Sequence, residues 1–169
     1  SMFELSTWDP VDVLYLLFYG EDGVSDDIAL FFQKMQNHFS LSEKLQKKIF
    51  SLNTDHDPLD NLITSLLFLK MEEEKRDYNE DFFILAGKIL SVSSCLICHY
   101  LKRPFKNSYG SNWIESFLNN IGISGELSFK LFKLLSIYYF DQGGGSVDAF
   151  AGKVAASSKA SLFSSVIAS

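Results

Sequence analysis

Two short stretches of the sequence carry residue types whose spacing could support chemistry. Cys95, Cys98 and His99 match the C-x-x-C-H spacing of covalent haem attachment, and thiolates and imidazoles are also zinc ligands. A five-residue pattern arises easily, however, and this one lies in a continuous apolar stretch, where small thiols act as ordinary core residues. Tetrahedral zinc needs four ligands, and only His38 and His56 remain as additional candidates. We therefore predict neither a cofactor nor a metal site.

The second stretch, residues 54–57, places His56 between the carboxylates of Asp55 and Asp57. Such a cluster can shift a pKa or bind a metal. Asp57 precedes Pro58, however, and an aspartate before a proline is typical of a helix N-cap, so we interpret the cluster as a cap and its loop. The sequence has no G-x-S-x-G nucleophile turn and no phosphate-binding loop. These observations predict a protein that is not an enzyme and has no catalytic residues.

The elements that would position these residues are all predicted to be helices. Asp9-Pro10 and Asp57-Pro58 begin two of them, and Asn112 with Glu115 forms a looser capping box. Apolar residues recur at helical spacing, as in 59–67, and no stretch alternates in the manner of a strand. The predicted helices span residues 9–19, 25–38, 41–52, 57–71, 79–102, 111–121 and 125–140. This pattern predicts an all-α fold of about seven helices, either a compact bundle or a short helical-repeat-like stack.

Composition restricts the classes of partner. The net charge is −6, which disfavours nucleic acid because phosphate backbones require clustered Lys and Arg. Two cysteines are too few for a disulfide framework, and this favours an intracellular location, cytoplasmic or nuclear. The apolar stretch 82–101 is long enough to span a bilayer. It is interrupted by polar residues, so we interpret it as a buried central helix rather than a membrane span.

The composition changes at the glycine-rich stretch 143–146. Residues 1–142 contain two alanines, whereas residues 147–169 contain six. An engineered flexible linker explains both the glycines and the change, and a natural glycine hinge before a native C-terminal helix is the alternative. The predicted division is an all-helical binding domain over 1–142, a Gly-Ser linker over 143–146 and a fused, partner-derived helical peptide over 147–169.

The segment 147–169 has an amphipathic pattern that predicts one tethered C-terminal helix. Such a peptide becomes ordered when its apolar stripe enters a hydrophobic groove. The residues predicted to carry the binding energy are Phe150, Val154, Leu162, Phe163, Val166 and Ile167. On the body of the protein, the residues predicted to line the groove are Phe129, Phe132 and Tyr139.

The leading functional hypothesis is therefore an adaptor or scaffold domain that binds an amphipathic helix of a partner protein, captured here as a linker-fused complex. An assembly or secretion chaperone that holds the segment as a client is the first alternative. A helical enzyme with an unrecognised active site is the second alternative. Docking of the tail into a neighbouring molecule, as a domain-swapped or tail-mediated dimer, is also open.

Overall fold

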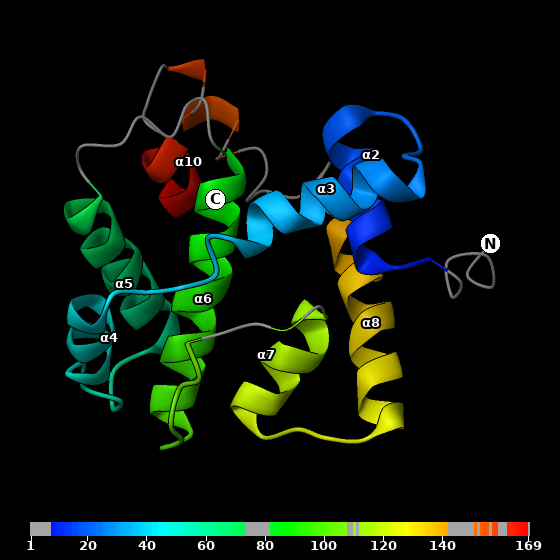
Figure 1. The fold of residues 1–169 in the computed structure, drawn as a ribbon. Coiled ribbons are helices and arrows are strands. Elements are labelled where there is room, and N and C mark those ends of the chain that lie inside the picture. Colours follow the sequence, from blue (N-terminus) through cyan, green and yellow to red (C-terminus); the bar gives the residue numbers. More distant parts are fainter. Residues whose placement is uncertain are drawn as a thin grey trace.

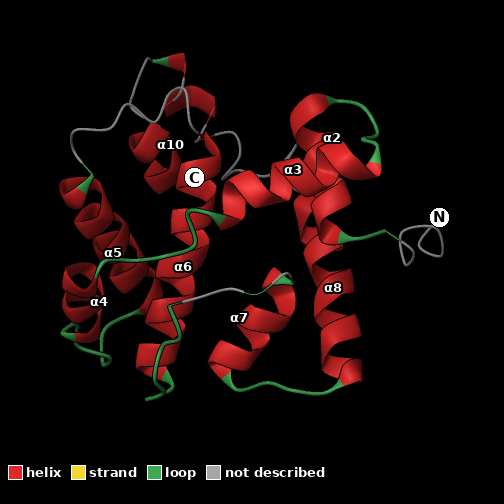
Figure 2. Ribbon diagram, viewed as in Figure 1, coloured by secondary structure: helices red, strands yellow, loops and turns green. Residues whose placement is uncertain are grey.

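The computed structural model describes residues 8–73, 82–107, 110, 112–141, 151, 153–155, 157–158 and 162–168. Every regular element within these ranges is helical, and none is a strand (Figure 2). The all-α prediction is confirmed, and each of the seven helices predicted over residues 9–140 corresponds to an observed one whose ends differ by a few residues. The helices are α2 (Pro10–Tyr19), α3 (Ser25–Gln36), α4 (Glu43–Phe50), α5 (Pro58–Glu72), α6 (Phe82–Tyr100), α7 (Trp113–Ile121), α8 (Glu126–Asp141) and α10 (Leu162–Ala168).

Local capping determines where several of these helices begin. At α2 a full capping box forms, because Asp9 Oδ1 accepts from the backbone of Val11 while Asp12 accepts from the backbone of Asp9. Asp57 caps α5 as predicted. The cap of α4 is Ser42, whose hydroxyl accepts from the backbone N–H of Leu45 at 3.0 Å.

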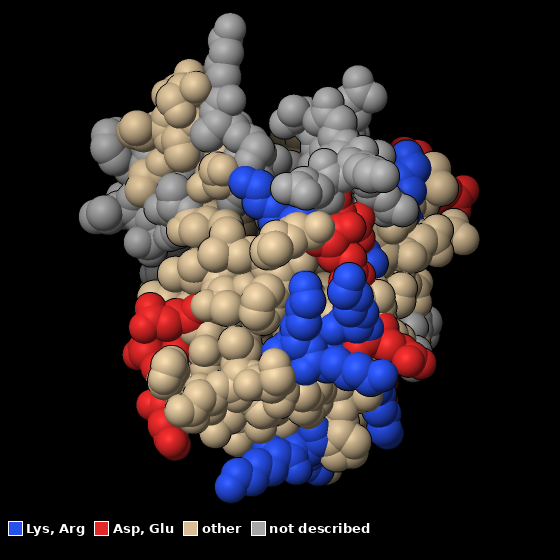
Figure 3. Space-filling view, turned by 90° about the vertical axis from the view of Figure 1, so that its left-hand side faces the viewer, with Lys and Arg blue, Asp and Glu red and all other residues tan. Residues whose placement is uncertain are grey.

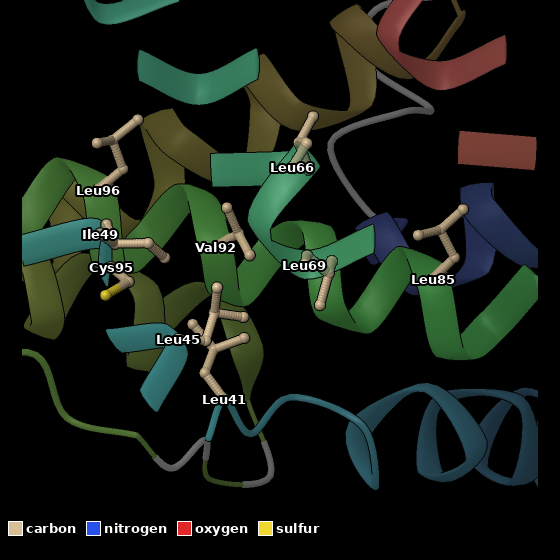
Figure 4. Close-up of a cluster of buried hydrophobic side chains, with 9 residues drawn as sticks. All are labelled: Leu41, Leu45, Ile49, Leu66, Leu69, Leu85, Val92, Cys95 and Leu96. Atoms are coloured by element: carbon tan, nitrogen blue, oxygen red, sulfur yellow. The ribbon is translucent and has the colours of Figure 1, made fainter. Parts of the chain in front are cut away.

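The helices form two groups that share α6 (Figure 1). One group packs α4, α5 and α10 against α6 around a cluster rich in leucine, shown in Figure 4. The other group packs α2, α3, α7 and α8 around an aromatic cluster that includes Phe31, Phe39 and Trp113. Helix α6 contributes Leu85 and Val92 to the first cluster and Ala86 and Leu90 to the second, so it is the central element predicted from its apolar sequence.

One face of α6 holds the end of α3 and the chain that follows it. A Cβ on Gly87 would lie 2.6 Å from the Met35 carbonyl oxygen, so the absence of a side chain permits this close approach. One residue later, Lys88 donates to the Ser40 carbonyl, and the hydroxyl of Ser91 donates to the Phe39 carbonyl. Helix α6 therefore contacts the backbone of Met35 at the end of α3 and of Phe39 and Ser40 in the connection to α4.

Two asparagine side chains each hold a distant backbone segment by both of their polar ends. Asn107 accepts from the backbone N–H of Leu41 and donates to its carbonyl, at 2.7 Å in each case. Asn120 does the same for Lys106, at 2.8 and 3.2 Å. Each amide therefore satisfies both polar groups of a residue outside the helices.

Helix α10 lies against α5, where Val166 and Ile167 pack on the first cluster. The predicted linker at 143–146 lies outside the described residues.

Candidate functional site

A network of hydrogen bonds lies where the C-terminal end of α6 meets α5 and the loop before it. The side chain of Asn61 is only 3% exposed, and its amide donates to the carbonyl of Asn53 at 2.8 Å and to the hydroxyl of Tyr100 at 2.7 Å. Tyr100 in turn donates to the carbonyl of His56 at 2.8 Å. A buried amide with these partners rigidifies the loop 51–57.

His99 lies beside Tyr100 of this network, with the two ring centroids 6.3 Å apart. Its Nε2 lies 2.8 Å from the Leu52 carbonyl, and its ring packs edge-on against Phe50, with the ring centroids 5.2 Å apart. A carbonyl oxygen only accepts, so Nε2 carries a proton and Nδ1 is the nitrogen left for acid–base chemistry. This arrangement orients the ring, as an imidazole needs before it can transfer a proton.

Positive charge gathers around the same region. Lys47 and Lys48 occupy the last turn of α4, next to the loop that His99 contacts. Arg103 lies on another side, because its guanidinium packs against Gly122 at the end of α7. Figure 3, which views the molecule from the side of α4 and α5, shows Lys and Arg side chains in the middle and lower part of this face, with Asp and Glu side chains beside them and at its edge. We call Lys44, Lys47 and Lys48 of α4 the lysine face. Within a chain of net charge −6, it is a surface suited to an anionic ligand.

Three hollows among the described residues have acidic side chains in their linings. A hollow of about 430 Å³ between α7 and α8 is lined by Glu115 and Glu126 together with amide and apolar groups. The hydrogen bond from Lys130, and its positive charge, lower the pKa of the Glu126 carboxyl, so this group stays ionised. Two further hollows beside α2 and α3 are lined by Asp9, Asp12 and Asp22. An anion is therefore favoured at the lysine face and disfavoured in these hollows.

The cysteine pair has a structural environment. Cys95 and Cys98 are both fully buried, and the Sγ of Cys98 lies 3.4 Å from the carbonyl of Asn120. Burial and then the neighbouring Cys98 raise the pKa of Cys95 to about 12. Burial also raises the pKa of Cys98, against the opposing charge of Arg103. Among the described residues no three His, Cys, Asp or Glu side chains come together as metal ligands.

The residues predicted to line a groove on the body are separated by the structure. Phe129 and Phe132 are partly buried and pack against the aromatic cluster, whereas Tyr139 is 65% exposed. The leucine side chains of α8, at positions 127, 131, 134 and 135, are exposed.

The predicted tail residues are described only in part. Val166 and Ile167 pack on the first cluster, and Val154 is exposed. Phe150 lies outside the described residues. Leu162 and Phe163 belong to α10, but their side chains are likewise outside the described set. What these side chains contribute to function is therefore untested.

Comparison with protein families matches residues 3–169 to "Citrate synthase, C-terminal domain". The chain belongs to this family. A citrate synthase of Dictyostelium discoideum is 24% identical to it over 135 residues, which cover 71% of this chain and 26% of that protein. This citrate synthase homologue therefore spans about a quarter of that curated relative.

Two solved citrate synthases have the same fold. The enzyme from Thermoplasma acidophilum, determined as a ternary complex with carboxymethyl coenzyme A and oxaloacetate, superposes with a TM-score of 0.86 at 18% identity. The match covers 98% of this chain and 45% of that one. The enzyme from Pyrobaculum aerophilum gives a TM-score of 0.77 at 19% identity, with 99% and 46% of the respective chains covered.

Family membership overturns several predictions made from the sequence. The adaptor or scaffold function and its chaperone alternative are wrong, and so is the prediction that the protein is not an enzyme, because the family is that of an enzyme. An amphipathic helix of another protein is wrong as the partner, because the family match includes residues 147–169. The alternative that the family supports is a helical enzyme without a recognised motif. Within the described residues, no helix is both long and apolar enough to cross a membrane.

Sequence reasoning missed the residues that organise the region beside the lysine face. Asn61 and Tyr100 are 39 positions apart, and nothing local links them. One signal was available for Asn61, which is a polar residue inside the strongly apolar stretch 59–69. A buried amide in such a position needs hydrogen-bond partners, and this could have marked it for attention.

Proposed function

We propose that this protein contributes to a citrate synthase, in which the acetyl group of acetyl-coenzyme A is joined to oxaloacetate. In this reaction the methyl group of the thioester loses a proton and forms a carbon–carbon bond with the ketone carbon of oxaloacetate. Water then cleaves the thioester, which yields citrate and free coenzyme A. The single observation that carries the proposal is the family match over residues 3–169.

The charge distribution supports anionic substrates. Oxaloacetate carries two carboxylates and coenzyme A carries phosphates, so both require positive charge where they approach the protein. The lysine face offers it, whereas the three hollows are lined by carboxylates. We propose that the lysine face attracts the anionic substrates, and that the fixed loop 51–57 keeps His99 in a constant position beside it.

The test measures release of the coenzyme A thiol and formation of citrate from acetyl-coenzyme A and oxaloacetate. Isothermal titration with each substrate accompanies it, because a chain that spans under half of its structural relatives can bind a substrate without completing the reaction. Saturable binding of either substrate, or citrate formation above that of the heat-inactivated protein, supports the proposal. The absence of both binding and citrate would refute it.

A charge-reversal pair tests the role of the lysine face. Lys47→Glu with Lys48→Glu should weaken coenzyme A binding at least tenfold and reduce its dependence on salt. Lys34→Glu with Lys153→Glu, at two exposed positions outside α4, changes the net charge by the same amount and is the control. An equal effect of the control would show that the lysine face has no special role.

Two finer predictions stay proposals. The division of the chain into 1–142, a linker at 143–146 and a tethered amphipathic helix within 147–169 is supported by the change in composition. The intracellular location is supported by the low cysteine content and by the two buried free thiols.

A further inference from the structure

Two of the acidic hollows are parts of one groove beside the N-terminal ends of α2 and α3. They have volumes of about 380 and 320 Å³, and Asp12, Ser25 and Ile28 line both of them. The larger, outer hollow extends to Trp8 and Asp22, and the smaller, inner hollow reaches the start of α7. We call the two hollows together the acidic groove.

The carboxylates of the acidic groove are not matched by positive charges of the chain. Asp9 lies 3.5 Å from the Nζ of Lys133. Within the described part of the chain, neither Asp12 nor Asp22 forms an ion pair with a lysine or an arginine. Asp12 uses one oxygen, Oδ2, to accept the backbone N–H of Asp9 at 2.8 Å, and its second oxygen still has the capacity to accept from a ligand. The groove therefore favours a cationic group.

The wall of the inner hollow also contains a hydrogen-bond donor that the chain leaves unused. Trp113 is 6% exposed and lines the inner hollow, and its indole Nε1 has no hydrogen-bond partner. A buried indole N–H usually has an acceptor, so its absence needs an explanation. A ligand that carries an acceptor into the inner hollow would supply one.

Apolar side chains lie between these polar groups. Those of the inner hollow come from α2 and α3 and are Val11, Ile28, Ala29 and Phe32. An apolar lining with a few polar groups is typical of a binding site. The ligand should therefore combine a positive charge, a hydrogen-bond acceptor and an apolar part.

A polypeptide segment with a basic side chain combines these three features. We propose that the acidic groove binds a short basic segment of another polypeptide. A lysine or arginine of the segment pairs with Asp12 and Asp22, a backbone carbonyl accepts from Nε1 of Trp113, and an apolar side chain covers Phe32. A simple amine would pair with the carboxylates but would leave the indole N–H without an acceptor. This binding is independent of the proposed citrate synthase activity, because the lysine face shares no residue with the groove.

The test measures binding of a capped tetrapeptide of alternating leucine and lysine to the full chain. A fluorescein label on the peptide reports binding by fluorescence polarisation. The control peptide has acetylated lysines, which removes the positive charges and keeps the backbone carbonyls. We expect saturable binding of the basic peptide, at least tenfold weaker binding of the acetylated one, and a loss of affinity as the salt concentration rises.

Paired variants locate the binding in the groove. Asp12→Asn with Asp22→Asn should weaken binding of the basic peptide at least tenfold. Asparagine keeps a side-chain oxygen that can accept the backbone N–H of Asp9, so α2 should still form, and circular dichroism checks this. Asp26→Asn with Asp27→Asn removes the same charge from exposed positions in the first turn of α3 and is the matched control, with little expected effect.

The indole gives a second readout. The chain contains two tryptophans, so Trp8→Phe leaves Trp113 as the remaining one. Unlabelled basic peptide should change the emission of Trp113 with the same midpoint as the polarisation signal. Trp113→Phe keeps an aromatic ring without the N–H and should weaken binding about fivefold, as expected for the loss of one hydrogen bond.

Four outcomes would overturn the proposal. The first is the absence of saturable binding by the basic peptide, and the second is equal binding of the acetylated peptide. The third is equal weakening by the two double variants, which would show a diffuse acidic field rather than a groove. The fourth is full displacement of the peptide by an equal concentration of spermidine, which would show that the groove binds positive charge alone and that a polyamine is its ligand.

Discussion

Gly87 is the position where local helix preference and tertiary packing oppose each other most directly. Alanine in a helix is favoured over glycine by about 1 kcal/mol, so α6 taken alone should become more stable with Gly87→Ala. In the folded protein the new Cβ would lie 2.6 Å from the Met35 carbonyl oxygen and 3.2 Å from Cδ1 of Phe39. Ordinary C···O contacts are about 3.3–3.6 Å, so α6 and the end of α3 must separate.

That separation determines the sign of the effect. Overpacking lowers the free energy of unfolding by about 1–3 kcal/mol. The hydrogen bonds from Lys88 and Ser91 to the same segment would also be stretched, and each of them contributes about 1 kcal/mol to stability. After subtraction of the helix-propensity gain, Gly87→Ala should lower the free energy of unfolding by about 1–3 kcal/mol. Urea denaturation followed by circular dichroism at constant m-value measures this change.

Ser93→Ala is the matched control, because this half-buried serine lies on the same helix. It should change stability by only a few tenths of a kcal/mol. A Gly87→Ala protein more stable than the original would refute the close approach of α6 to Met35, and with it the described packing of α3.

Three further predictions concern the C-terminal half of α6 and its surroundings. Asn61→Ala removes two hydrogen bonds of a buried amide and should cost about 2 kcal/mol in urea unfolding, whereas a loss below 0.5 kcal/mol would contradict the network. Lys102 adopts a left-handed conformation with φ of 53°, which glycine adopts without strain. Lys102→Gly should therefore raise the free energy of unfolding by up to about 1 kcal/mol, measured as a higher melting temperature. A lower melting temperature would show that the lysine side chain makes a compensating contact. Because the pKa of Cys95 is raised to about 12, the folded state keeps a proton that the unfolded chain releases near pH 8.5. The contribution of Cys95 to the free energy of unfolding is complete below that pH, and it should fall by up to about 1.4 kcal/mol per pH unit as the pH rises toward 12. Unfolding measured between about pH 9 and 10.5 should show this fall, and Cys95→Ala should make it less steep.

The helices could be predicted from the sequence because their signals are local. Asp57 before Pro58 marks the start of α5, and the structure confirms both the cap and the helix. The faces of α8 could not be predicted in this way. Its leucine stripe and its phenylalanines are both apolar at helical spacing, and only the packing of α2 and α7 shows which side is covered.

The functional class could not be read from local motifs. Citrate synthase membership follows from a match over residues 3–169, and the identity to the Dictyostelium enzyme is only 24% over 135 residues. Long-range clamps are equally invisible, since Asn107 and Leu41 are 66 positions apart. The glycines at 143–146 were the most conspicuous local feature, and their interpretation as the boundary of a bound partner segment led to the wrong function.

The docking of α10 on the first cluster affects how the protein is made. The cluster is otherwise composed of residues from 41–105, but Val166 and Ile167 complete it. At a synthesis rate of about 5–20 residues per second, residue 168 follows residue 96 by roughly 4–14 s. For that time the surface of α5 beneath α10 is uncovered while the nascent chain is still being extended. A ribosome stall or a premature stop before residue 162 would therefore leave an apolar surface on α5 open to chaperones and proteases.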